Sequence, residues 1–340
     1  MVLAACLEPE LQVANSLGSY ARHQPEKTLL YQTVQNHMAA FFAHCEASER
    51  SVPSFIKEEF DAFLHCGILA HGFARVYCKE CRYDRLVAFS CKKRGFCGSC
   101  MARRMSSTAA HLVDSVIPVI PTRQWVLSVP SPLRYLMAYD SKALNKVINT
   151  YTSTIFGWLR KKAVQAGVTT EACAAQPGAI TFVQRFGSAL NLNVHLHGQF
   201  SDGVFVKDEA GQVLFHKTPA PTLKEIRVIT EKVARRMHKW LQKRLQETGG
   251  EDALSQDQPL LATCYTASLR YLTALGAKAG RPLMRVFEGI SISDGSREER
   301  TVAGFNLHAS IAIAAEDRQG LERLLRYMGR SPLSEDRLSQ

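Results

Sequence analysis

Apolar side chains recur at helical spacing in the first part of the chain and again in three later segments. Within residues 26–66, the segments LLYQTVQNHMAAFFAHC and FIKEEFDAFLHC repeat apolar residues every three or four positions on either side of Pro53. This period predicts two helices separated by the proline. The same period predicts helices over 139–166, after the capping-box sequence at Thr222–Glu225, and over 321–330.

Between these helices, shorter apolar segments predict strands. They are QWVLSVP at 124–130, GAITFVQRF at 178–186 and FNLHASIAI at 305–313. We expect NVHLHGQF and GVFV to pair as a hairpin around Ser201-Asp202-Gly203, because Asp-Gly favours a tight turn. The helices and strands follow no regular βαβ order, so we expect an α+β fold.

The charge of the chain favours a polyanionic ligand. The 340 residues hold 42 Lys and Arg against 31 Asp and Glu, a formal net charge of +11. Residues 75–104 carry nine basic against two acidic side chains, and residues 227–244 carry seven against one. Such segments are typical of nucleic-acid binding, although a solvated helix face is the alternative for the second. No apolar run reaches the length of a transmembrane helix, so we expect no membrane partner.

The cysteines predict a metal site. Without a secretory signal we expect a reducing, cytoplasmic compartment, where metal binding is favoured over disulfides. Two C-x2-C pairs separated by fifteen residues indicate one structural Zn²⁺, held by Cys78, Cys81, Cys97 and Cys100. Cys91 is an alternative ligand, whereas the spacing of His65, Cys66 and His71 fits no second complete site. Basic residues interleaved with these cysteines are candidate DNA contacts: Lys92, Lys93, Arg94, Arg103 and Arg104.

The segment NLNVHLHGQFSDG at 191–203 places two histidines one residue apart. Alternate side chains of a strand point to the same face, so His195 and His197 project together, about 7 Å apart along the backbone. Val194 and Leu196 then face the core. Two imidazoles on one face can converge on one metal ion, although this pattern taken alone is weak evidence for a site.

These segments together resemble the HUH nucleases, named for a His-hydrophobe-His motif, and more closely the rolling-circle transposases of the insertion sequence ninety-one family. The matching segments, in the family's order, are GILAHGF (67–73), CKECRYDRLVAFSCKKRGFCGSCMARRM (78–105), HLVDSVIPVIPTRQWVLSVPSPLR (111–134), TFVQRFGSALNLNVHLHGQFSDGV (181–204), and GFNLHASIAI with LERLLRYMGRSPLSEDRL (within 304–338).

The resemblance implies three parts of the chain. They are a helical N-terminal region at 1–72, a zinc-binding module at 73–110, and an HUH catalytic domain at 111–340 with a central antiparallel sheet flanked by helices. It also implies a bacterial, nucleoid-associated enzyme. Such an enzyme cuts and rejoins DNA, single-stranded or as hairpin ends of the mobile element, through a tyrosine.

Tyr327 is the candidate nucleophile. It falls outside the apolar stripe of the predicted helix, which consists of Leu321, Leu324, Leu325 and Met328. It shares the polar side with guanidinium groups that can hold phosphate, from Arg323, Arg326 and Arg330. Attack on a phosphodiester would leave a 5′-phosphotyrosine and a free 3′-OH, so that rejoining needs no ATP.

We expect His195 and His197 to hold a catalytic Mg²⁺ or Mn²⁺, which would act as a Lewis acid at the scissile phosphate. A third protein ligand is expected, and the candidates are Gln184, Asp202 and His308. Asp202 has an alternative role in the turn, and His308 lies on the polar side of its strand.

The chain departs from the family in two ways. Founding members carry two tyrosines four residues apart, whereas the flanking positions here are Arg323 and Ser331, which favours a mechanism with one tyrosine. The chain also ends thirteen residues after Tyr327, where relatives usually continue. The alternative to a nicking transposase is therefore a truncated, inactive DNA-binding relic. A hydrolase of small phosphoesters would leave the basic segments and the zinc module unexplained.

Overall fold

The computed structural model describes residues 24–93, 95–187, 190–250, 252–282 and 300–333. The chain divides into two units, one made of the described residues up to Ala102 together with Leu333, and the other of Arg103–Pro332. The helix α3 (Gly98–His111) contains the boundary between them. Each unit has a hydrophobic core of its own.

Helices and a hairpin form the first unit. The helices predicted on either side of Pro53 are present as α1 (Leu29–Ala47) and α2 (Ser54–His65), after the short helix η1 (Pro25–Lys27). Their apolar sides meet in a small core of Tyr31, Val34, Phe63, Cys66 and Cys97. A second short helix, η2 (Leu69–His71), leads into an antiparallel hairpin of β1 (Phe73–Tyr77) and β2 (Asp84–Ala88).

An antiparallel sheet lies at the centre of the second unit. Among the described residues its strand order is β4-β5-β3-β9-β8, and β10 also pairs with β3. The strands are β3 (Thr122–Ser128), β4 (Ala179–Phe186), β5 (Leu192–Ser201), β8 (Thr301–Val302), β9 (Phe305–His308) and β10 (Ala312–Ile313). Because β3 and β4 pair with the two edges of β5, this strand lies inside the sheet.

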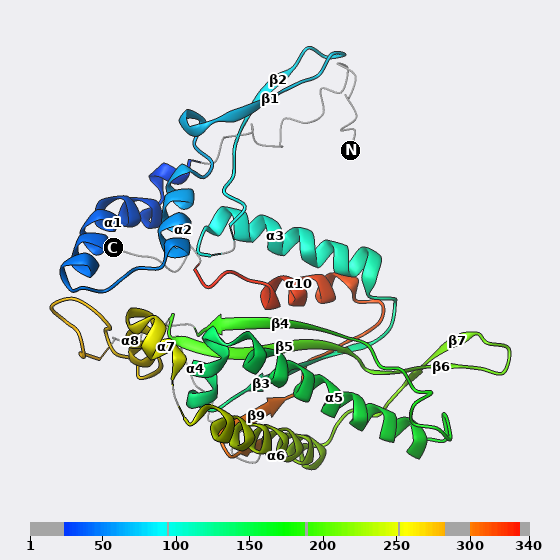
Figure 1. Cartoon of the computed structure of the whole chain (residues 1–340). Coiled ribbons are helices and arrows are strands. Elements are labelled where there is room, and N and C mark those ends of the chain that lie inside the picture. Colours follow the sequence, from blue (N-terminus) through cyan, green and yellow to red (C-terminus); the bar gives the residue numbers. More distant parts are fainter. Residues whose placement is uncertain (1–23, 94, 188–189, 251, 283–299, 334–340) are drawn as a thin grey trace. The chain divides into compact units, whose positions relative to one another are not determined.

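Two long helices cover one face of this sheet (Figure 1). The first, α5 (Ser141–Gln165), begins at Asp140, whose carboxylate accepts hydrogen bonds from two main-chain N–H groups of the first turn. The second, α6 (Leu223–Thr248), begins at the predicted capping box, in which Thr222 and Glu225 exchange hydrogen bonds. It ends at Gly249, whose left-handed backbone (φ 63°) suits glycine.

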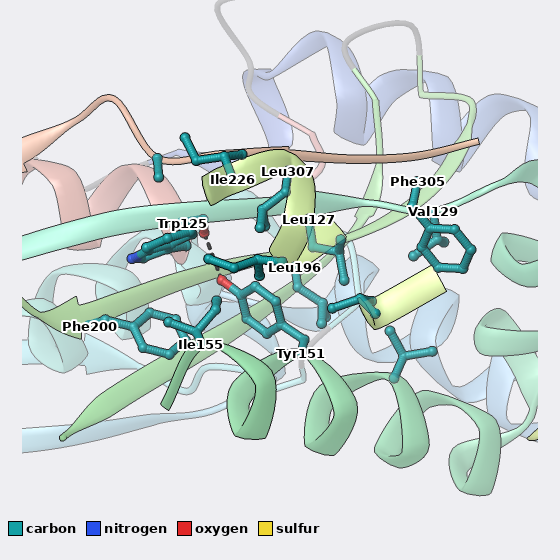
Figure 2. Close-up of a cluster of buried hydrophobic side chains, with 14 of the residues drawn as sticks. Trp125, Leu127, Val129, Tyr151, Ile155, Leu196, Phe200, Ile226, Phe305 and Leu307 are labelled. Carbon is teal, nitrogen blue, oxygen red and sulfur yellow. Dashed lines mark hydrogen bonds between the residues drawn. The ribbon is translucent and has the colours of Figure 1, made fainter. Parts of the chain in front are cut away.

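The main core lies between these helices and the sheet, and Figure 2 shows its central side chains. The Tyr151 hydroxyl donates to the main-chain oxygen of Trp125 (2.9 Å), which satisfies the polar end of a fully buried ring. A β-carbon at Gly198 would lie 2.5 Å from this hydroxyl and 2.4 Å from the Phe200 ring. The glycine after the histidine pair is therefore required by packing on the core face.

The helix α10 (Arg318–Met328) covers part of the opposite face of the sheet (Figure 1). Its buried side chains, Leu321, Leu325 and Met328, form a separate cluster with Ala109 of α3 and Val113 of the π-helix η3 (Leu112–Val116). Phe182 of β4 packs against the same cluster from the sheet. The helix is thus held between the sheet and the segment that precedes β3.

The sequence pattern was wrong about one hairpin. The segment predicted to pair with residues 193–200 is β6 (Gly203–Lys207), and it pairs with β7 (Val213–Lys217) instead. Both edges of β5 are occupied by β3 and β4, so β6 has no place beside it. The pattern also missed four α-helices of the described residues, namely α3, α4 (Ser131–Tyr139), α7 (Ala253–Asp257) and α8 (Pro259–Leu269).

The structure is mixed helix and antiparallel sheet, as the α+β prediction required. A cysteine cluster lies in its N-terminal part. Within the described part of the chain, no helix has both the length and the apolar character needed to cross a membrane.

Candidate active site

The strand β5 places His195 and His197 on the face of the sheet opposite to α5 and α6. Their neighbours in the strand, Val194 and Leu196, are fully buried in the main core on the other face. The two imidazole rings lie 4.9 Å apart between centroids. The alternation of a strand thus brings the two rings side by side, as the spacing predicts.

One ring nitrogen of each histidine is held by a neighbour, and the other is left for a ligand. Nδ1 of His195 donates to the main-chain oxygen of Asn193 (2.5 Å), and Nδ1 of His197 lies 3.2 Å from the side-chain amide of Gln124. Nε2 of His197 is buried and has no hydrogen-bond partner among the described residues. The amide nitrogen of Gln124 faces Nδ1 of His197; with the amide turned so that its oxygen accepts from Nδ1–H, both Nε2 atoms would carry a lone pair, as metal ligands require. The pair therefore fits a divalent cation.

Burial keeps this pair neutral. Burial, together with the nearby His195 and Arg330, lowers the pKa of His197 to about 4. Burial also lowers the pKa of His195, against the opposing effect of the hydrogen bond to Asn193. A histidine with a depressed pKa is unprotonated at neutral pH, so both lone pairs are available there.

The helix α10 brings Tyr327 to the histidine pair. The phenol ring lies edge-on to the His197 ring, with 5.9 Å between centroids. Tyr327 is 46% exposed, whereas Leu325 and Met328 on the same helix are buried. The guanidinium of Arg330 lies 4.4 Å from the centroid of the Tyr327 ring. An exposed phenol, a cation, the buried imidazole of His197 and the half-buried imidazole of His195 thus come together at one place.

Gln184 holds the end of this helix against the sheet. It lies on β4 directly opposite His195 in the strand pairing, and it is 8% exposed. Its side-chain nitrogen donates to the main-chain oxygens of Tyr327 (3.2 Å) and Met328 (3.0 Å). These two carbonyls lie in the last turn of α10, where helical partners run out. Gln184 therefore connects the strand pair that carries the histidines to the residue that carries the phenol.

The other two candidates for a third metal ligand lie farther from the pair. Both carboxylate oxygens of Asp202 accept hydrogen bonds from Arg123 (2.8 and 2.9 Å) in a buried ion pair. In the strand pairing, Val126 lies between His308 and His197, which puts the two histidines about 10 Å apart across the sheet. Nε2 of His308 lies 2.8 Å from the Ser310 hydroxyl. Gln184 is the candidate that the register places next to His195.

The basic residues predicted to contact DNA occupy different surroundings. Arg330 lies at the site, Arg323 is exposed, and Arg326 pairs with Glu322 (2.5 Å) on the same helix. Lys92 is exposed, and Lys93 lies 3.4 Å from Glu58. On α3, Arg103 is exposed and Arg104 is half-buried, while Arg94 lies outside the described residues.

The first unit gathers four cysteines, and they differ from the predicted set. Cys66, Cys91, Cys97 and Cys100 have their sulfur atoms within 4.8 Å of one another. The alternative ligand Cys91 belongs to this group, and Cys66, which the spacing argument set aside, belongs to it as well. Cys97 and Cys100 belong both to the predicted set and to this cluster.

Cys78 and Cys81, the other two predicted ligands, lie in the turn between β1 and β2 and outside this cluster. The other end of this hairpin is fixed beside Cys66 by main-chain hydrogen bonds between Gly67 and Phe89 (2.9 Å) and between Phe89 and Gly72 (3.0 Å). Cys78 is five residues along the strand from the start of β1, which is about 16 Å. The length of the hairpin thus separates the first C-x2-C pair from the cluster.

The spacing of the four sulfur atoms fits a tetrahedral zinc ion. Cys100 Sγ lies 3.5 Å from the sulfur atoms of Cys66 and of Cys91, and Cys97 Sγ lies 3.6 Å from that of Cys66. Zn–S bonds of about 2.3 Å in a tetrahedron separate the sulfur atoms by about 3.8 Å. A hydrogen bond from Cys97 lowers the pKa of Cys66 to about 5, whereas burial raises the pKa of Cys91 to about 12. A dication at the centre would favour the thiolate form of all four.

Two family models match the chain. The model described as "Transposase zinc-binding domain" matches residues 33–129, which include all four clustered cysteines. The model described as "Putative transposase" matches residues 178–340, which include the histidine pair and Tyr327. The chain belongs to the insertion sequence ninety-one family of transposases. Neither a curated protein nor a solved structure matches it.

Membership of this family settles two coarse points. This transposase has an enzymatic role in DNA transposition, so DNA is its partner. Its N-terminal part is a zinc-binding domain, and the four clustered cysteines are the ligand set that the structure supports for a structural Zn²⁺.

The corrected ligand set makes a direct prediction. Cys66→Ser should lower the affinity of the transposase for zinc by at least about 100-fold, since loss of a residue that merely supports a ligand already costs 10–100-fold. Cys78→Ser makes the same chemical change in the hairpin turn and should leave zinc affinity unchanged. Zinc release to a chromophoric chelator measures both. Equal loss from the two variants would contradict the assignment.

Sequence reasoning missed two residues of these sites. The sequence pattern predicts only that Gln124 belongs to a strand, yet its side-chain amide contacts Nδ1 of His197. Its partner in the pairing of β3 with β5 is Gln199, two residues from His197 on the same face, so the strand register would have identified it. Cys66 carried a weaker signal, because it ends a helix and has no second cysteine at C-x2-C spacing.

Proposed function

We propose that this transposase nicks and rejoins single-stranded DNA at the ends of its element through a covalent intermediate on Tyr327. The observation that carries the proposal is the contact between two distant segments, in which the Tyr327 ring lies 5.9 Å from the His197 ring. An exposed phenol has no packing reason to lie beside the buried imidazole of His197. A nucleophile that must reach a phosphate bound at the histidine pair has a functional reason to lie there.

In the proposed reaction, the Tyr327 oxygen attacks the scissile phosphorus in line with the leaving 3′-oxygen. A bond forms between the tyrosine oxygen and phosphorus, the bond between phosphorus and the 3′-oxygen breaks, and the phenol proton passes to solvent. The 3′-oxygen takes up a proton and leaves as a free 3′-OH. Arg330 lies beside the phenol ring and supplies positive charge for the phosphate oxygens. Attack by a new 3′-OH on the phosphotyrosine reverses these steps and joins the strands.

His195 and His197 would hold the divalent cation, with the side-chain oxygen of Gln184 the best-placed third ligand. Nitrogen ligands favour Mn²⁺ over Mg²⁺. When bound, the cation supplies Lewis acidity at a non-bridging phosphate oxygen. Gln184 would then have two roles, because its side-chain nitrogen already holds the end of the tyrosine helix. The hydrogen bonds of Asn193 and Gln124 orient the two rings for this task.

The test is a search for the covalent intermediate. The transposase is incubated with Mn²⁺ and labelled single-stranded DNA from the element's ends, and products are separated on a denaturing gel. We expect a band of protein carrying DNA that requires the divalent cation and maps to Tyr327 by mass spectrometry. DNA binding without any such band, over a range of end sequences and cations, would contradict nicking and favour the inactive DNA-binding relic.

A further inference from the structure

Most of the net charge of the chain lies on the two helices that cover the core face of the sheet. Helix α5 carries five basic side chains and no acidic one, and α6 carries eight basic against three acidic. Together they hold a net charge of +10, against +11 for the whole chain. The histidine pair and Tyr327 lie across the sheet, on the face that α10 covers (Figure 1). This charge is therefore not part of the candidate active site.

The acidic side chains of the two helices are already neutralised. Each of the three lies in an ion pair with a basic residue of α5 or α6, and the pairs are Glu225–Lys162, Glu231–Arg227 and Glu247–Lys243. Asp140, which caps α5, pairs with Arg244 of α6. Arg236 is used between the helices, where it donates to main-chain and hydroxyl oxygens of α5.

The remaining cations are exposed and have no ion pair in the described part of the chain. On α6 they are Lys224, Lys232, Arg235 and Lys239, and on α5 they are Lys142 and Lys161, whereas Lys146 and Arg160 of α5 are half-buried. Lys232, Arg235 and Lys239 follow one another at spacings of three and four residues, so they share one face of α6. Val233 and Met237, on the opposite side of the helix, are fully buried. The stripe from Lys224 to Lys239 is about 22 Å long.

This stripe suits the phosphate backbone of a duplex. At about 3.4 Å per base pair along each strand, it spans about six base pairs. Surfaces that bind single strands add aromatic rings on which bases stack. The aromatic rings of the two helices point inward: Tyr151 is fully buried, and Phe156, Trp158 and Trp240 pack against the main core. A cationic surface without such rings recognises backbone charge rather than bases.

We propose that the exposed cations on the outer face of α5 and α6 form a second DNA-binding surface, which holds duplex DNA by its phosphates. The name basic stripe is used below for this whole surface, including the row from Lys224 to Lys239 on α6. The inference needs only that the transposase acts on DNA. It does not depend on the proposed chemistry at Tyr327. A duplex held on this face leaves the opposite face of the sheet open to the strand that is cut. The transposase would thus engage two DNA segments at once.

The test removes two charges of the basic stripe without changing the fold. Lys232→Gln with Lys239→Gln is compared with the wild type and with a matched control, Lys207→Gln with Lys217→Gln, which removes two exposed charges from β6 and β7. Binding of a labelled 20-base-pair duplex is followed by fluorescence anisotropy across salt concentrations. We expect the stripe variant to bind about tenfold more weakly, with a salt dependence reduced by about 2 in log–log slope, since each phosphate contact contributes about 0.9. The control should match the wild type.

Equal affinity and slope for the two double variants would overturn the proposal. So would a stripe effect seen with vesicles of anionic lipid but absent with duplex DNA. Melting temperatures of all three proteins show that folding is unchanged, and Lys232→Glu with Lys239→Glu should enlarge the loss. Adduct formation on a short single strand is measured separately and should be equal in all variants. If no adduct forms with any of the variants, the proposed chemistry at Tyr327 is wrong. The binding measurements with duplex DNA still show whether the basic stripe binds a duplex.

Discussion

Replacing Tyr327 with phenylalanine is expected to abolish covalent attachment of the transposase to DNA. The substitution removes the attacking oxygen and keeps the ring, so the contacts with His197 and Arg330 remain available. Loss of a nucleophile costs on the order of 10⁴-fold in rate or more, because the other groups of the site cannot replace it. DNA binding should stay within about threefold of the wild type, since phosphate contacts depend on the cations. The measurement is the yield of the denaturation-resistant protein–DNA band over time.

Tyr83→Phe is a suitable control for this variant. Tyr83 is 62% exposed, so loss of its hydroxyl group is tolerated by the fold. It lies in the turn of the first unit's hairpin, outside the sheet that carries the histidines. We expect it to form the adduct at the wild-type rate. Persistence of the adduct in the Tyr327 variant, with the DNA mapped to another residue, would refute the assignment of the nucleophile.

Replacing either histidine with alanine is expected to slow adduct formation by at least about 100-fold while DNA binding persists. Each substitution would remove one of the two proposed imidazole ligands, and removal of a supporting residue alone costs 10–100-fold in metal affinity or activity. The rate is measured against the concentration of Mn²⁺. Because both ligands are needed, raising the concentration should recover only part of the lost rate. Full activity in either variant would show that the pair holds no catalytic metal.

His308→Ala is the matched control for the histidine variants. It removes the same side chain from the same face of the sheet, but Val126 separates it from His197 in the strand pairing. We expect the control to keep most of the activity. His197→Ala also leaves the Gln124 amide without its partner, which costs about 1–3 kcal/mol if the amide stays buried. Melting temperatures are therefore needed to separate this loss of stability from loss of the metal.

The pH dependence of the wild type follows from the same environment. Protonated imidazole cannot bind a metal, and burial depresses the pKa of both histidines, that of His197 to about 4. The rate should therefore stay constant as the pH falls through about 6.5, where an ordinary histidine would take up a proton. We expect the rate to fall only at a pH well below 6.5. A midpoint near 6.5 that disappears in the His195→Ala variant would contradict this interpretation.

Local patterns were sufficient for the parts of the site that lie on single elements. The alternation of apolar and polar residues placed His195 and His197 on one face, and the apolar stripe of the last helix left Tyr327 outside it. Turn chemistry was less informative, because Asp202-Gly203 suggested a hairpin that the sheet does not contain. Asp202 is engaged instead by Arg123, a partner 79 residues away in the sequence.

Residue patterns alone indicated the family, most of the helical and strand segments, the histidine pair, the phenol and the presence of a thiolate site. These follow from residue types at short spacings, which a local pattern records. The folded chain was needed to show which four cysteines meet, that Gln124 contacts His197 and Gln184 holds the tyrosine helix, and that the basic stripe lies across the sheet from them. Such contacts depend on the length of a hairpin and on strand register, because residues far apart in the chain meet only where whole elements pack together.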